Sequence, residues 1–236
     1  MRLGGPRRAV PGPAHSPGAL ARVCRSSGWG RGPPAVVDTK GEYGDLAGLY
    51  LPIAIAVFAL VALALVAFLV LFRARRPGPP SARHEHNALE LAYVAVLAAI
   101  AVVLLVRTFG VESRVDASAG AGALRVAVVG AKWDWRFAYP GLGVRSTRGE
   151  LVVPAGRTIA FSGRSLDVIH DFWVPGVRFQ HQVFPDHVER WKLVFPRPGR
   201  YQGVCAWFCG LFHQDMRFTV RALAGAAFDS WVASRR

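Results

Sequence analysis

Residues 205–216 of this 236-residue chain, CAWFCGLFHQDM, bring two cysteines, a histidine and a methionine close together. Cys205 and Cys209 are four residues apart, His213 follows after another four, and Met216 lies three further on. Thiolates select Cu(I), zinc or iron–sulfur clusters, imidazole suits copper and zinc, and a thioether is a soft ligand that zinc rarely uses. The set therefore indicates copper. Because a mononuclear blue site needs one cysteine, the second thiolate indicates two copper ions that share bridging sulfurs.

Two other interpretations of this cluster stay open. A disulfide between Cys205 and Cys209 would suit an oxidising compartment, although it leaves the positions of His213 and Met216 unexplained. A zinc site would find only two thiolates and one local imidazole. The third cysteine, Cys24, lies in the N-terminal tail, and we expect it to be unrelated.

A copper site of this kind in a β-sandwich usually takes one more histidine from far upstream. The best candidate is His170 in SLDVIHDFWVPGVRF, where a loop follows one expected strand and precedes another. His181 and His187 are rivals in the same region, but a surface or loop position is the better expectation for both.

Two long apolar runs precede this region and predict membrane-spanning helices. Residues 46–72 contain no charged side chain, and their number exceeds the roughly 20 residues that a spanning helix needs. Residues 88–109 form the second run, interrupted only by Glu90 and Arg107 near its ends. Arg107 can extend its charge to the membrane interface.

The linker between the two runs, residues 73–87, indicates how they are oriented. It carries four arginines against the single acid Glu85, and such an excess of positive charge favours the cytoplasmic side. In a bacterial plasma membrane, both termini would then lie outside the cytoplasm. Residues 1–45 are basic and rich in proline and glycine, and we expect a disordered tail without a function of its own.

After the second run the hydrophobic period becomes that of β-strands. In KWDWRFAYP the residues Trp133, Trp135, Phe137 and Tyr139 share one face. The runs ERWKLVF and MRFTVRA repeat the alternation, which sets Lys192 on the polar face, and turn signals such as YPGLG and PRPG separate the runs. We therefore predict a β-sandwich or small barrel over residues 110–222, followed by a tail over 223–236.

The charge and the motifs exclude several classes of function. The formal net charge is +14, which can indicate a nucleic-acid partner. Here the basic residues are scattered through tail, linker and domain, so we expect none. No phosphate-binding glycine loop, Ser–His–Asp constellation or paired-carboxylate site is evident, so hydrolysis is not expected.

Taken together, the two spans and the motifs KWDWRFAYP, DVIHDFWVP and CAWFCGLFHQDM resemble subunit II of the heme–copper oxidases. The resemblance runs from about Leu46 to Ala222, and HEHNALELAY extends it into the second span. It implies a two-helix transmembrane hairpin followed by an all-β, cupredoxin-like domain that carries the dinuclear copper centre CuA.

The resemblance also implies roles for single residues. The side-chain copper ligands would be His170, Cys205, Cys209, His213 and Met216, and Trp207 would contribute its backbone carbonyl. Trp133 matches the residue through which the family accepts electrons, although plain core packing is the alternative. Glu90 matches a glutamate at the entrance of a proton channel.

One departure from the family bears on a second metal. Most members have a glutamate where this chain has Trp207, and that glutamate also helps to bind magnesium at the interface with the catalytic subunit. The interface magnesium is therefore in doubt here, whereas a carbonyl ligand to copper survives the change.

The function that follows is that of an electron-accepting subunit. Its partners would be membrane lipid, a catalytic subunit I that holds the heme, a subunit III and a cytochrome c-type donor, with oxygen as the terminal acceptor. A related nitric oxide reductase is the first alternative. A membrane-anchored copper carrier and a quinol-oxidising subunit that lost its copper fit less well, because the chain has only two methionines and retains every ligand.

The charge of the domain bears on the donor. Residues 111–236 hold 17 Lys and Arg against 10 Asp and Glu, a net of +7. A basic soluble cytochrome c would be repelled by such a domain, so we expect a donor that is acidic, tethered to the membrane or part of the same assembly.

Overall fold

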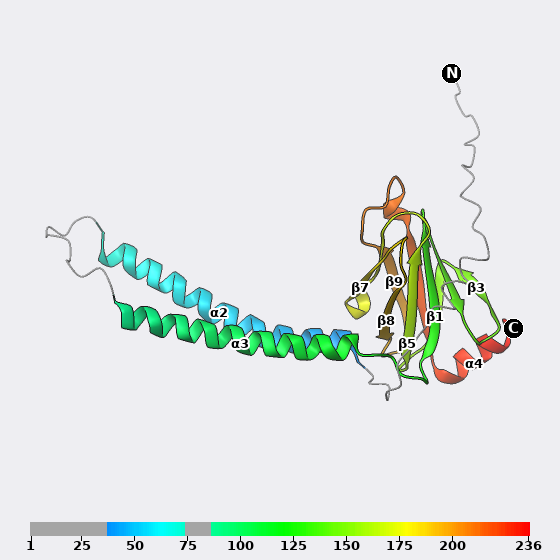
Figure 1. Cartoon of the computed structure of the whole chain (residues 1–236), viewed down its shortest axis with the longest axis horizontal. Coiled ribbons are helices and arrows are strands. Elements are labelled where there is room, and N and C mark those ends of the chain that lie inside the picture. The colour runs from blue at the N-terminus through cyan, green and yellow to red at the C-terminus, as the bar shows by residue number, and fades with distance from the viewer. Residues whose placement is uncertain (1–36, 74–85) are drawn as a thin grey trace, which may run out of the picture. The chain divides into compact units, whose positions relative to one another are not determined.

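The computed structural model of the chain describes residues 37–73 and 86–236, as two units that are treated separately below (Figure 1). Most of the expected tail and most of the linker lie outside these residues. The arginine excess on which the orientation rests therefore falls largely on the part of the chain that is not described.

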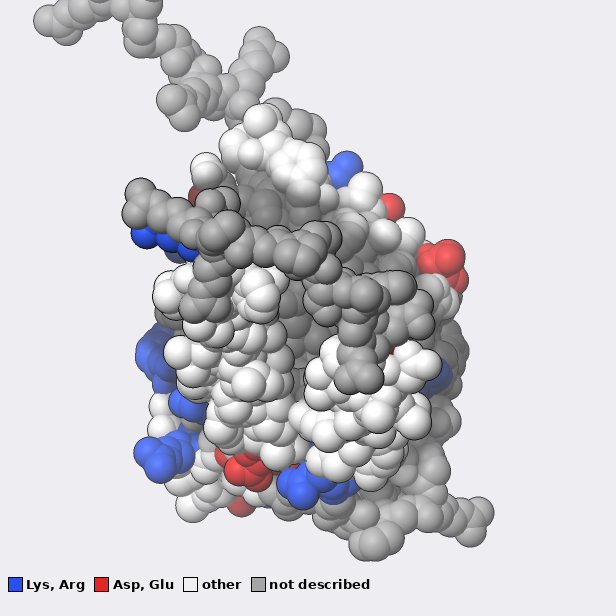
Figure 2. Space-filling view, turned by 90° about the vertical axis from the view of Figure 1, so that its left-hand side faces the viewer, with Lys and Arg blue, Asp and Glu red and all other residues white. Residues whose placement is uncertain are grey.

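The first unit is a pair of long helices, α2 (Thr39–Leu71) and α3 (Asn87–Asp116). Both are long and apolar enough to cross a membrane. Their apolar side chains are exposed, and charged residues are sparse on the hairpin in Figure 2. This is the surface expected of helices whose solvent is lipid.

Polar contacts tie the two helices together near one end. The hydroxyl groups of Tyr50 and Thr108 are 2.6 Å apart, and the guanidinium of Arg114 contacts the carboxylate of Glu42 at 2.7 Å. The helices also extend past the apolar runs. In particular, α3 continues to Asp116, whereas the sequence predicted that the second span ends at residue 109 and that the β domain begins at residue 110. Residues 110–116 stay helical because their backbone groups complete hydrogen bonds within α3.

The second unit is a β-sandwich of two five-stranded sheets, in the orders β3-β2-β1-β5-β8 and β4-β10-β9-β6-β7. The strands are β1 (Leu124–Ala131), β2 (Asp134–Tyr139), β3 (Val144–Arg148), β4 (Glu150–Pro154), β5 (Thr158–Ser165), β6 (His170–Val174), β7 (Phe179–Val183), β8 (Glu189–Val194), β9 (Gly199–Cys205) and β10 (Arg217–Leu223). Parallel pairs join β1 to β5 and β10 to β4, and the remaining neighbours are antiparallel. The predicted sandwich is thus confirmed.

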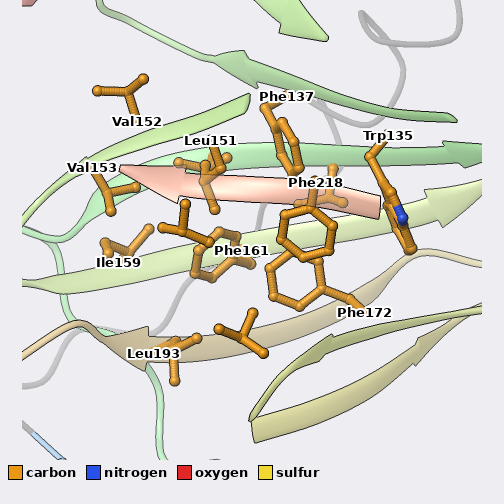
Figure 3. Close-up of a cluster of buried hydrophobic side chains, with 14 of the residues drawn as sticks. Trp135, Phe137, Leu151, Val152, Val153, Ile159, Phe161, Phe172, Leu193 and Phe218 are labelled. Carbon is orange, nitrogen blue, oxygen red and sulfur yellow. The ribbon is translucent and has the colours of Figure 1, made fainter. Parts of the chain in front are cut away.

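Aromatic side chains from both sheets fill the space between the layers (Figure 3). The ring of Phe172 in β6 stacks on Phe218 in β10 at 4.7 Å, and Trp135 in β2 meets both rings edge to face. All three side chains are buried. The alternation read from KWDWRFAYP is confirmed for Trp135, Phe137 and Tyr139, while Trp133 lies in the turn before β2.

Lys192 departs from the expected pattern of β8. The sequence assigned it to the polar, outward face, yet it is only 5% exposed, and its ammonium group has no hydrogen-bond partner among the described residues. Burial lowers the pKa of Lys192. Alternation therefore identifies the two faces of β8, but it does not identify which of them reaches water.

The C-terminal residues are part of the domain rather than a tail. Residues Gly225–Ala233 form helix α4, and its side chains Phe228, Trp231 and Val232 are buried in the main core cluster. Trp231 meets the ring of Tyr139 edge to face at 5.2 Å. The boundary expected after residue 222 is therefore wrong, because a short helix with three apolar residues on one side can cover the end of a sandwich.

Candidate metal centre

His170 and Cys205 are brought together by the pairing of two adjacent strands. His170 is the first residue of β6 and Cys205 is the last residue of β9, and the two strands are hydrogen-bonded neighbours with Phe172 opposite Cys205. As a result His170 Nδ1 lies 3.8 Å from Cys205 Sγ. Residues 35 apart in the sequence thus meet inside the sandwich, where His170 is fully buried.

The loop from β9 to β10 folds back on itself and adds the remaining donors. The amide of Cys205 donates to the carbonyl of Met216, and the amide of His213 donates to that of Gly210. The short 3-10 helix η2 (His213–Asp215) then returns the chain to β10. Gly210 has φ +115°, a conformation that side-chain-bearing residues rarely adopt. This loop geometry brings the donors of residues 205–216 together.

The two sulfur atoms form the middle of the cluster. Cys205 Sγ and Cys209 Sγ are 3.9 Å apart, well beyond the roughly 2.05 Å of a disulfide bond, and both thiols are free. Cys209 Sγ lies 3.5 Å from His213 Nδ1 and 3.7 Å from Met216 Sδ. Cys205 Sγ lies 3.3 Å from the carbonyl oxygen of Trp207.

The ligand atoms of His170, Cys205 and Cys209 all lie within 4.8 Å of one another, and the cluster could hold a metal ion. All three side chains are buried, as is Met216, while His213 is partly exposed. A set of two thiols, two imidazoles and a thioether, four of them buried, matches the preferences of copper.

Asp167 orients the buried histidine, and the sequence analysis did not assign it this role. Its carboxylate lies 2.7 Å from His170 Nε2, so that the other ring nitrogen, Nδ1, faces the sulfur of Cys205. Such carboxylate–histidine pairs fix the tautomer and the ring orientation of metal ligands. Its position three residues before His170 is the signal that could have revealed it.

The electrostatics of this pair follow from burial and hydrogen bonding. Burial opposes ionisation of Asp167, but hydrogen bonds from His170 and from the amides of Lys132 and Val168 hold its pKa far below the usual range. Burial likewise opposes the charged form of His170, yet the contacts with Asp167 and Cys205 raise its pKa. Both shifts favour the charged forms, a carboxylate beside an imidazolium.

The two thiols differ in their pKa. Burial raises the pKa of Cys205, but the contact with His170 and the amide of Asp171 outweigh it, so the net shift is downward. Burial and the neighbouring Cys205 charge raise the pKa of Cys209 to about 12. Both thiols must lose their protons to act as metal ligands.

The rival histidines lie outside the cluster. His181 contacts Glu189 at 3.3 Å and packs against Trp191, and His187 lies between Asp186 and Glu189 at 2.7 Å from each. These contacts account for the positions of both histidine side chains without a metal.

Trp133 contacts the loop that carries the ligands. Its ring meets Phe212 edge to face at 4.8 Å and lies against Gly210, where an added Cβ would be 3.6 Å from the indole. The indole nitrogen is buried and has no partner among the described residues. Glu90 lies in the first turn of α3, where its side chain is exposed.

Comparison with known proteins agrees with this picture. Residues 144–223 match the family described as "Cytochrome C oxidase subunit II, periplasmic domain". The cytochrome c oxidase subunit 2 of Alkalihalophilus pseudofirmus is 28% identical over 207 residues, covering 83% of this chain and 60% of that protein. The probable cytochrome c oxidase subunit 2 of Rickettsia bellii is 29% identical over 227 residues, covering 86% and 82%.

Other similarities concern the domain alone. The cytochrome c oxidase subunit 2 of Synechocystis is 35% identical over 115 residues, which cover 49% of this chain and 34% of that protein. The crystal structure of the periplasmic domain of subunit II of cytochrome oxidase from Bradyrhizobium japonicum is 25% identical, with a TM-score of 0.46 over 48% of this chain and 92% of that one. The chain thus spans 60% or less of the length of two of the three relatives named here.

Two membrane-length helices, a cupredoxin-like sandwich and a buried thiolate–imidazole cluster define the class of membrane-anchored cupredoxins. Within that class, residues 144–223 match the periplasmic domain of cytochrome c oxidase subunit II, and most of the chain is similar to subunit 2 of bacterial cytochrome c oxidases.

Proposed function

We propose that this chain is the electron-accepting subunit of a heme–copper oxidase. It would take electrons from a cytochrome c-type donor at a dinuclear CuA centre and pass them to the heme of a catalytic partner, where oxygen is reduced. The observation that carries the proposal is the set of donors around the sulfur atoms of Cys205 and Cys209, which lie 3.9 Å apart.

The donors fit a dinuclear copper centre by number and by type. The residues that would hold it are His170, Cys205, Cys209, His213 and Met216, with the carbonyl oxygen of Trp207. Soft thiolate and thioether donors favour copper over magnesium or calcium, and two thiolates are one more than a mononuclear copper site uses. When bound, the copper centre supplies a carrier that gains and loses one electron.

The surrounding protein has the task of holding these donors still. Asp167 keeps the imidazole of His170 in one orientation, and the neighbouring strands β6 and β9 hold His170 and Cys205 side by side. The aromatic core under the cluster excludes water, because Trp135, Phe172 and Phe218 are all buried. A rigid, dry site changes little when its charge changes, and that property favours rapid electron transfer.

The proposal extends to the two residues that would connect the site to its surroundings. Trp133 would receive electrons from the donor, and its packing on Phe212 and Gly210 supports this role. Glu90 would lie at the entrance of a proton channel that the catalytic subunit completes. Both termini and the sandwich would then lie outside the cytoplasm.

Magnesium is not part of the proposed centre. The side chain of Trp207 has no carboxylate, and it is 48% exposed on the loop that carries the ligands. An interface magnesium in the assembled oxidase would have to find its oxygen ligands elsewhere.

The test uses the whole complex, tagged on this chain and purified from native membranes. With an artificial reductant, oxygen and nitric oxide consumption are followed separately, and copper per chain is measured. We expect rapid oxygen uptake and two copper ions for each chain. Rapid nitric oxide turnover with little oxygen uptake would instead make the assembly a nitric oxide reductase.

A variant makes the role of the cluster specific. Cys209→Ser should leave the complex assembled but abolish electron transfer from the donor, since it removes one of the two central sulfurs. Cys24→Ser is the matched control and should keep full activity. A fully active Cys209→Ser complex would refute the proposal, and a chain that exchanges copper freely without any oxidase activity would point to a copper carrier.

A further inference from the structure

A cavity at one end of the sandwich, away from the metal cluster, is lined by arginines. It has a volume of about 550 Å³ and lies where helix α4 packs beside the start of β1 and the turn after β2. Arg125, Arg157 and Arg236 all line it, and none of the proposed copper ligands does. In Figure 1, α4 lies at the end of the sandwich opposite the loop that carries the cysteines.

Two of these guanidinium groups lack a counter-charge. Arg125 and Arg157 are exposed, and neither forms a hydrogen bond or an ion pair with another described residue. Arg236 donates its Nε–H to the carbonyl of Leu142 at 3.1 Å, which leaves the rest of its guanidinium available. Asp229 is the one acidic side chain among the lining residues, and it has no ion pair with any described residue.

Charge and shape together indicate the ligand. Three arginines against one carboxylate give the cavity a positive charge, and the planar guanidinium binds phosphate oxygens with two parallel hydrogen bonds. The volume falls in the range of small-molecule sites, roughly 300 to 1,000 Å³. A phosphate group with a short polar substituent has this size and charge.

The position in the chain favours a lipid as the source of that phosphate. Helix α3 ends at Asp116 and the lining begins at Ala121, and a stretch of this length spans at most about 18 Å when fully extended. The last residues of α3 are polar, so the chain leaves the apolar layer before Asp116. The first lining residue is therefore tethered within about 18 Å of the end of α3 by the chain alone.

We propose that the cavity lined by Arg125, Arg157 and Arg236 binds a phosphate-type anion, supplied by the headgroup of an anionic phospholipid. Such binding would tie the sandwich to the membrane surface through a contact that is independent of the helices. It does not rest on the proposed electron transfer, because no residue is shared.

The experiment measures binding to the full chain, purified in a neutral detergent, by calorimetric titration. The probes are a short-chain phosphatidylglycerol, the matching phosphatidylcholine and inorganic phosphate. We expect phosphatidylglycerol to bind and phosphatidylcholine to bind at least tenfold more weakly. Inorganic phosphate that binds as tightly as phosphatidylglycerol would identify free phosphate as the source of the anion.

Variants separate a built site from general attraction to a basic protein. The double variant Arg125→Gln/Arg157→Gln should weaken phosphatidylglycerol binding about tenfold or more, because each arginine supplies charge-assisted hydrogen bonds. Asp229→Asn should strengthen it severalfold. Arg145→Gln, an exposed arginine of β3 outside the cavity, is the matched control and should change little.

Two results would overturn the inference: equal affinity for the neutral lipid, or an equal loss of affinity in Arg145→Gln and in the double variant. Thermal unfolding is followed in parallel. If the double variant folds poorly, the single variants Arg125→Gln and Arg157→Gln replace it, each with an expected severalfold loss.

Discussion

The arrangement around His170 shows how one buried side chain depends on its neighbours. The ring is held between the carboxylate of Asp167 on one nitrogen and the sulfur of Cys205 near the other. Asp167 is itself fixed by the backbone amides of Lys132 and Val168. The orientation of His170, a proposed metal ligand, is therefore set by the turn before β2 as well as by its own strand.

This dependence predicts the effect of changing Asp167. Asp167→Ala removes the acceptor that orients His170, and we expect copper affinity to fall by about 10- to 100-fold, the usual cost of losing such a partner. Asp167→Asn should lower copper affinity less, because the amide oxygen of asparagine can still accept the hydrogen bond from His170. Copper retained per chain during dialysis against a chelator measures both.

The control for this prediction is Asp186→Ala. Asp186 also contacts a histidine, but it lies outside the cluster, so its loss should leave copper retention unchanged. Equal retention in Asp167→Ala and the parent chain would show that the strands alone orient His170.

At the scale of elements, the neighbouring strands β9 and β10 of one sheet include a position with no room for a side chain. Gly203 in β9 faces Phe218, and an added Cβ would lie 2.1 Å from that ring. Phe218 cannot move away freely, because it stacks on Phe172 and meets Trp135. The glycine is therefore a packing requirement of the sandwich beneath the metal cluster.

Gly203→Ala should lower the free energy of unfolding by about 1 to 3 kcal/mol, the cost of overpacking a core. Denaturant unfolding of the full chain, followed by tryptophan fluorescence, measures the change. Gly225→Ala is the matched control, since its added methyl group would meet nothing within 4 Å, and it should be neutral. If both variants unfold alike, the close approach at Gly203 is not important for stability.

The hydroxyl group of Tyr139 ties one sheet to the other. The amide of Val152 in β4 donates to the Tyr139 hydroxyl of β2 at 2.8 Å. Burial raises the pKa of Tyr139 to about 12, and the amide of Val152 only partly opposes it. Ionisation of this side chain is therefore harder in the folded protein than in the unfolded chain.

The stability of the sandwich should accordingly depend on alkaline pH. Because the folded pKa is above the unfolded value of about 10, the contribution of Tyr139 is complete below pH 10 and is lost as the pH rises toward 12. Tyr139 contributes about 2 to 3 kcal/mol to the free energy of unfolding in this way. The free energy of unfolding, measured at several pH values, should fall between about pH 10 and pH 12. In Tyr139→Phe, the part of this fall that Tyr139 causes should be missing. If the pH dependence of the free energy of unfolding is the same in Tyr139→Phe, other groups cause it.

For the whole molecule, charge would decide which electron donors can approach the proposed copper centre. The sandwich region carries an excess of basic residues, and like charges slow an encounter while opposite charges accelerate it. Salt screens either effect, with a Debye length of about 10 Å at 0.1 M ionic strength. The sign of the salt dependence therefore reports the sign of the charge on the donor.

With the purified complex, electron transfer from a basic soluble cytochrome c should be slow at low salt and should not fall as salt is added. An acidic cytochrome should react faster and lose its advantage as the ionic strength rises. Stopped-flow oxidation of each donor measures both. A basic cytochrome that slows with added salt would contradict the prediction, because that dependence indicates attraction.

The sequence by itself was sufficient for those features that depend on local order. The two helices follow from long apolar runs, the strand faces of Trp135, Phe137 and Tyr139 follow from alternation, and the cluster at residues 205–216 is visible because its donors are close in the chain. Local patterns predict such elements well because the backbone period decides which side chains share a face.

Only the tertiary structure decided the features that join distant segments. The approach of His170 to Cys205, the burial of Lys192, the packing of α4 on the core and the cavity lined by Arg125 and Arg157 all arise where separate elements meet. No local period encodes such contacts, because they depend on which strands become neighbours and on what covers each face. Long-range packing, rather than propensity, therefore determines how the metal cluster is held and where the domain ends.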